Sequence, residues 1–348
     1  MVAKFEQIPT GNGRRWLRGF RGGHDRATIP VARRGAALLA CSLGVSLAVV
    51  PVRGANADDD EAVVAAERGV NLSQLPRLAD RDEALPSSAY DVYAFGGQVA
   101  SVALELAALW GAISIKGAIT WKWGTASFRF NPEGYFGKDT GSFGMDKVGH
   151  AYSTYVLTEL LTDRIRAYAP EPDGAPITAA ALALSTLLYV EVFDGFSVDH
   201  GFAYEDVIFD SLGAGFSVLR NIVPGIRNKL DYRMEYVPSG NRSGFHPMTD
   251  YSGQKFVLVL KLAGFEWLED TAPSYFEVHT GYFARGFTPA ERERGEPERR
   301  VPYVGIGLNL QQLLFGSEHP AEVPLEQYGR RALEYLQVPY AYAAYPQN

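Results

Sequence analysis

Long, nearly uncharged apolar runs dominate the first part of the chain. The first extends from Tyr93 to Ile119 and contains only one glutamine, one glutamate and one lysine. This length and composition are typical of a buried or membrane-embedded helix rather than of a surface helix. Three more helices are predicted, ended by proline or glycine, over residues 146–167, 177–193 and 202–223.

After Leu230 the apolar runs become shorter and alternate with polar residues or glycine. Such runs predict β-strands in which each strand has one face covered. The fold class is therefore expected to be α+β: a bundle of four or five apolar helices, a small antiparallel sheet of about three strands, and a C-terminal amphipathic helix. The strands are expected over residues 255–262, 275–287 and 301–310, and the last helix over residues 325–336.

The first 57 residues have the composition of an export signal. They carry nine Lys or Arg and two acidic residues, whereas residues 58–348 have a net charge of −14. Arg33 and Arg34 precede an uncharged apolar run, and Ala55-Asn56-Ala57 places small residues where a signal peptidase cleaves. We therefore predict a signal peptide, export to the cell envelope, and no nucleic-acid partner for so acidic a protein.

Two other interpretations of this segment stay open. The apolar run is just about long enough to act as a transmembrane anchor, and Cys41, the single cysteine, lies in a sequence that resembles a lipoprotein box. The organisation that we expect has four parts: residues 1–57 as signal peptide, 58–90 as an acidic, poorly ordered segment, 91–230 as a helical core, and 231–348 as strands plus a helix.

Charged residues gather at the ends of the predicted helices. These residues occur in pairs, and the two members of a pair are three or four positions apart, which places them on one helix face. A charge in an apolar helix is costly unless it is paired, so these residues require an explanation. The candidates are Asp146, Lys147, His150, Glu191, Asp194, Asp206 and Asp210.

The residue types allow three interpretations of this cluster. The first is a buried hydrogen-bonded network with a structural role, and another is a site in which Lys147 and His150 bind a lipid phosphate. The third is a metal centre, for which one histidine and several carboxylates favour Mg²⁺, Mn²⁺ or Ca²⁺ over zinc. Its ligands would be Asp146, His150, Glu191, Asp194 and Asp206.

The order of these motifs resembles the YfiM-type family of bacterial envelope proteins, which is similar to the VanZ-like membrane proteins. The resemblance spans about residues 90–225 and rests on Asp146-Lys147-x-x-His150, Glu191-x-x-Asp194-Gly195 and Asp206-x-x-x-Asp210-x-x-Gly213. Asp210 stands where the pattern has asparagine. The resemblance implies an envelope location and a VanZ-like helical core around the polar residues, and it implies no reaction.

Together these observations predict an exported, membrane-associated envelope protein that binds or organises a lipid or another envelope component through the buried cluster. A metal-dependent hydrolase that acts on a lipid or cell-wall precursor is the second hypothesis, and a structural scaffold without a ligand is the third. The sequence has no phosphate-binding P-loop and no Gly-x-Ser-x-Gly motif. Whether the protein is an enzyme, its oligomeric state, and the choice between inner and outer membrane stay open.

Overall fold

The computed structural model describes residues 92–137, 140–241, 244–316 and 324–346. The predicted signal peptide, the acidic segment at residues 58–90 and Cys41 all lie outside the described residues.

The helical region confirms three of the predicted helices to within two residues at each end. The first apolar run, however, forms two helices instead of one, because the backbone leaves the helical conformation at Val102 (φ −122°, ψ 8°). The helices are α2 (Val92–Ser101), α3 (Ala103–Thr120), α4 (Met145–Tyr168), α5 (Ala175–Asp194) and α6 (Tyr204–Ile222).

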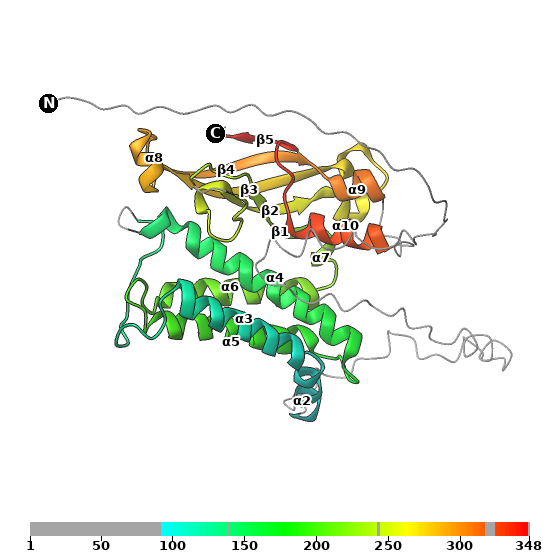
Figure 1. Ribbon diagram of the computed structural model, residues 1–348. Helices are drawn as coiled ribbons and strands as arrows, with labels where there is room; N and C mark the ends of the chain where they lie inside the picture. The colour runs from blue at the N-terminus through cyan, green and yellow to red at the C-terminus, as the bar shows by residue number, and fades with distance from the viewer. Residues whose placement is uncertain (1–91, 138–139, 242–243, 317–323, 347–348) are drawn as a thin grey trace, which may run out of the picture. The chain divides into compact units, whose positions relative to one another are not determined.

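Helices α4, α5 and α6 pack closely on one another, and α3 lies against α5 (Figure 1). Small residues permit this approach: a Cβ atom at Gly213 of α6 would lie 2.0 Å from the backbone oxygen of Ala151 in α4. The alanines of α5 act in the same way, since Ala175, Ala179 and Ala183 are fully buried.

Among the described helices, α3 and α5 are long and apolar enough to cross a membrane. Their mean hydropathy is 1.3 and 1.6, and 17% and 39% of the residues in these stretches are buried within the protein. Length and hydropathy alone do not separate a membrane span from the core helix of a water-soluble domain.

In the described residues the sheet has five antiparallel strands in chain order. The three predicted strands are confirmed, and the expected number of about three is corrected to five by two strands at the sheet edges. The strands are β1 (Leu230–Tyr236), β2 (Gln254–Lys261), β3 (Phe276–Arg285), β4 (Arg299–Leu308) and β5 (Tyr342–Tyr345).

Short helices connect these strands, and the expected C-terminal amphipathic helix is α10. The α-helical ones are α7 (Ile226–Lys229), α8 (Pro289–Glu293), α9 (Leu310–Phe315) and α10 (Pro324–Tyr335). The 3₁₀ turns are η3 (Gly141–Gly144), η4 (Tyr251–Gly253), η5 (Leu262–Gly264), η6 (Glu266–Leu268) and η7 (Ala272–Tyr275).

One face of each strand is more buried than the other. Over much of the sheet the more buried face carries charged side chains. Glu277 and His279 of β3 are fully buried, whereas Val278 between them is 40% exposed. Val278 pairs with Ile306 of β4, which is 61% exposed. A patch of apolar side chains therefore stays open on the opposite face of the sheet.

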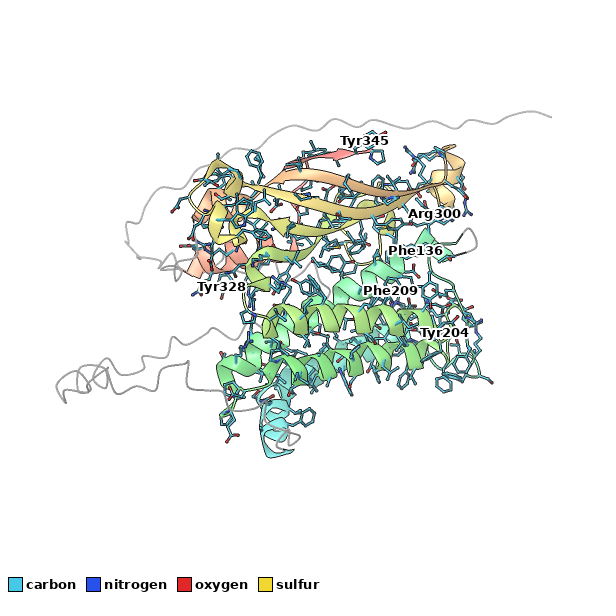
Figure 2. The ribbon with its side chains drawn as sticks, turned by 180° about the vertical axis from the view of Figure 1, so that it is seen from behind. Phe136, Tyr204, Phe209, Arg300, Tyr328 and Tyr345 are labelled. Carbon is cyan, nitrogen blue, oxygen red and sulfur yellow. The ribbon has the colours of Figure 1, made fainter. Side chains whose placement is uncertain are left out.

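The helices cover the part of that apolar face nearest to β1. Met234 of β1 and Phe256 of β2 are buried in one core with Tyr152 of α4. Figure 2 shows Phe136 between the helices and the sheet, where its ring contacts both Phe209 of α6 and Tyr282 of β3. Aromatic contacts thus hold the helical region and the sheet together.

Candidate functional site

The candidate site lies where three helix ends meet one loop. Helix α4 begins after the η3 turn, whose last residue, Gly144, has a left-handed backbone (φ 81°). A Cβ atom there would lie 2.4 Å from the ring of Phe136, so the turn requires glycine. The end of α5 and the first turn of α6 lie beside the start of α4 and contribute the other charged side chains. Carboxylates in the first turns of α4 and α6, such as Asp146 and Asp206, are favoured by the helix dipole.

We call this group of side chains the helix-end cluster. Its members are Glu133, Asp146, Lys147, His150, Glu191, Asp206 and Asp210.

Lys147 is fully buried and is the cation at one side of the helix-end cluster. Its Nζ atom lies 2.6 Å from Glu133 Oε2, 2.9 Å from Asp146 Oδ2 and 2.7 Å from Asp206 Oδ1. One oxygen atom from each of these three carboxylates lies within 4.8 Å of the others, a spacing that suits a metal ion. The ammonium group already contacts all three, so it acts there as the cation.

His150 organises the other side of the helix-end cluster. Its Nδ1 atom lies 3.2 Å from Asp210 Oδ1, which also accepts a hydrogen bond of 2.7 Å from the Thr154 hydroxyl. Its Nε2 atom lies 3.8 Å from Glu191 Oε1 and 3.9 Å from Asp206 Oδ2. His150, Glu191 and Asp206 form a second group whose ligand atoms are close enough together to hold a metal ion.

Burial and neighbouring charges shift the pKa values in the helix-end cluster. Burial raises the pKa of Glu191 to about 8, although His150 opposes this effect, and burial raises the pKa of Asp146 to about 6 against the charge of Lys147. Burial would lower the pKa of His150, but the hydrogen bond and charge of Asp210, with the charges of Asp206 and Glu191, raise it to about 10.

The helix-end cluster opens into a cavity of about 700 Å³. Along α4 the lining changes from the charged Asp146 and His150 to the apolar Val156, Leu157 and Leu160. The cavity follows α4 for 14 residues between Asp146 and Leu160, a length of about 21 Å along the helix axis. Apolar walls continue on α3 and α5, with Leu109, Ile113, Leu187 and Val190. The cavity is therefore amphipathic.

The structure brings six of the seven sequence-predicted residues into the helix-end cluster and holds Asp194 apart from it. Asp194 lines the cavity, but its Oδ1 atom accepts a hydrogen bond of 2.6 Å from the indole nitrogen of Trp123. Neither group of potential metal ligands includes Asp194. Burial raises its pKa as well.

Sequence reasoning missed Glu133, which lies in the loop before α4. The loop has no helical or strand periodicity that would single out this residue. The only signal was a carboxylate between proline and glycine, 14 positions before the lysine that it contacts. Glu205, which is almost fully buried, was not among the candidate site residues; its Oε1 atom accepts the Gly134 N–H and so fixes the same loop on α6.

One protein-family model matches this part of the chain. Residues 132–222 match the family described as Predicted periplasmic lipoprotein (DUF2279). The match covers about a quarter of the chain and includes every member of the helix-end cluster. The protein is exported to the cell envelope, as its N-terminal composition predicts. No curated protein and no solved structure matches the chain.

Proposed function

We propose that this exported protein binds an envelope amphiphile, with the polar head at the helix-end cluster and the apolar part along α4. The observation that carries the proposal is the lining of the cavity, which is charged at the start of α4 and apolar over the next three turns. Sites for small molecules are typically concave and mostly apolar, with a few polar groups that fix the orientation of the ligand. The volume of about 700 Å³ lies within the range of such sites.

A cavity-filling substitution tests this proposal. Ala112 is an exposed residue of α3 that lines the cavity, whereas Ala118 is exposed on the same helix and lies outside the lining. We expect Ala112→Trp to lose most of the non-covalently bound lipid that the full-length protein retains, and Ala118→Trp to retain it. Solvent extraction and mass spectrometry measure this lipid. Wild-type protein without bound lipid, or equal amounts in the two variants, would contradict the proposal.

A metal-dependent hydrolase is the second candidate. The observation that favours it is the convergence of His150 Nε2, Glu191 Oε1 and Asp206 Oδ2, with Asp210 behind His150 as the carboxylate that often orients a metal-binding histidine. An ion held there would polarise an ester or phosphate oxygen. Asp146 would act as general base, because its Oδ1 atom accepts no hydrogen bond from a described residue and its pKa of about 6 suits proton transfer.

This candidate stands second because a metal ion must displace the proton from His150, whose raised pKa of about 10 keeps it protonated at neutral pH. Elemental analysis of full-length protein tests it. About one Mg²⁺, Mn²⁺ or Ca²⁺ per chain is expected in the wild type and in Asp194→Asn, and none in Glu191→Gln. Wild-type protein without a stoichiometric ion would remove this candidate.

We also propose a family relation, association with a membrane and a lipid attachment site for this protein. The relation to the YfiM-type and VanZ-like families is supported by the order of the motifs, and association with a membrane is supported by exposed apolar residues of α3, such as Leu104 and Ile119. The family description supports lipid attachment at Cys41 in place of cleavage after Ala57. Membrane fractionation in high salt and then alkaline carbonate, together with the mass of the mature N-terminus, tests the last two points.

A further inference from the structure

The carboxylates that line the cavity outnumber the cationic groups that could neutralise them. Five acidic residues line it, against Lys116, His150 and His200 in the lining and the buried Lys147 next to them. Lys147 contacts three of the acidic residues with one oxygen atom each, which leaves the remaining oxygens without a lysine partner. The acidic lining residues are Glu133, Asp146, Glu191, Asp194 and Asp206.

Glu191 and Asp146 each have a carboxylate oxygen with no hydrogen-bond donor in the described chain. Glu191 is 2% exposed and lines the cavity, and its Oε2 atom accepts the Ala203 N–H. No described residue donates to its Oε1 atom, and the nearest cationic atom, His150 Nε2, is 3.8 Å away. Asp146 Oδ1 is likewise buried without a donor. A buried acceptor without a partner is unfavourable, so these atoms favour a ligand that donates hydrogen bonds.

We propose that the amphiphile in this cavity carries a cationic amine head, whose N–H groups donate to Glu191. This inference rests on the proposed function and names the class of its ligand. An ammonium group supplies three donors and one positive charge, and charge-assisted hydrogen bonds to carboxylates are the stronger kind. An anionic head would instead face a surplus of carboxylates and would need a bridging divalent cation.

Two short-chain lipids that differ only in the head group test the inference on the full-length protein. Dihexanoylphosphatidylethanolamine and dihexanoylphosphatidylglycerol are titrated as monomers in the presence of EDTA, and calorimetry measures the dissociation constants. We expect the ethanolamine lipid to bind at least about tenfold more tightly, the effect of one charge-assisted hydrogen bond.

A matched pair of variants locates the amine. Glu191→Gln and Asp194→Asn each replace one carboxyl group of the cavity lining by a neutral amide, but the oxygen of Asp194 is already bonded to Trp123. We expect Glu191→Gln to weaken binding of the ethanolamine lipid by about tenfold and Asp194→Asn to weaken it by less than about threefold. Equal losses in the two variants would contradict the placement of the amine.

The outcomes separate this inference from the proposed function. Equal or tighter binding of the glycerol lipid in EDTA overturns the amine and leaves amphiphile binding intact. Binding of the glycerol lipid only when Mg²⁺ is added also overturns the amine and supports a metal-bridged head instead. If neither lipid binds under any of these conditions, the proposed function fails together with the inference.

Discussion

Two groups of buried charged residues in the described part of the chain differ in their charge balance. The sheet network is built around Arg220, which lies 2.9 Å from Asp231 and 3.3 Å from Glu159, and around Arg233, which lies 2.8 Å from Glu277. Its ion pairs join five acidic side chains to five Lys or Arg side chains and one histidine: Glu159, Asp163, Asp231, Glu277, Glu334, Arg220, Arg227, Arg233, Lys261, Arg331 and His279.

The helix-end cluster contains five carboxylates against Lys147 and His150 only. Four of its acidic residues line the cavity, whereas no member of the sheet network does. A balanced group that does not line this cavity has a structural role as its simplest explanation. An unbalanced group that lines a cavity is unfavourable for stability alone, which is typical of a functional site.

The largest effect is expected when the balance of the sheet network is broken. Arg220→Met leaves Glu159 and Asp231 with one cation fewer in a fully buried environment. Removing one partner of a buried ion pair costs about 3–5 kcal/mol, so the free energy of unfolding should fall by that amount. Urea denaturation of the full-length protein measures it. A change below about 1 kcal/mol would show that the network contributes little to stability.

Lys147→Met removes the cation from one side of the helix-end cluster and should have a smaller, pH-dependent effect. It leaves the carboxylates of Glu133, Asp146 and Asp206 facing one another without a cation. We expect a loss of about 3 kcal/mol at pH 8. The loss should shrink towards pH 5, because the crowded carboxyl groups then bind protons. A loss that is the same at both pH values would contradict this account.

The wild-type protein should lose stability as the pH rises. Folding raises the pKa of His150 from 6.5 to about 10 and that of Glu191 from 4.5 to about 8. The folded state therefore binds more protons than the unfolded state between these values, and stability falls as the pH rises through them. Thermal melting between pH 5 and pH 10 measures the slope. His150→Gln should flatten the part of the slope between about pH 6.5 and 10, and an unchanged slope would contradict the raised pKa of His150.

The smallest effect is expected at Asp194. The Asp194→Asn side chain still offers an oxygen to the Trp123 indole N–H, so the hydrogen bond of 2.6 Å can be kept. The free energy of unfolding should change by less than about 1 kcal/mol. A loss as large as that of Lys147→Met would place Asp194 in the helix-end cluster after all.

The sequence predicted the helices and the cluster because both leave strong local signals. Apolar runs ended by proline or glycine define α4, α5 and α6, and charges at their ends are conspicuous in so apolar a context. The edge strand β1 was missed because its buried face carries Asp231, Arg233 and Glu235, the reverse of the usual pattern. Strand β5 was also missed, because it has only four residues and pairs along one edge of β4.

The details of the site depended on tertiary contacts that no local pattern contains. Glu191 and Asp194 share one helix face, yet Trp123, from a segment 71 residues earlier than Asp194, binds the second carboxylate. Glu133 joins the helix-end cluster only because the loop that carries it folds back over α6. Packing between distant segments determines which carboxylates join the cluster, and a single sequence does not reveal that packing.

The most direct test of the difference between the two charged groups is the free energy of unfolding of Glu191→Gln at pH 7.5, measured by urea denaturation beside wild type and Arg220→Met. If the carboxylate of Glu191 is kept for binding, its neutral amide should leave the protein as stable as wild type or more stable, because a buried group of raised pKa no longer has to ionise. A loss of about 3 kcal/mol or more, comparable to that of Arg220→Met, would mean that the helix-end cluster is a structural network like the one in the sheet.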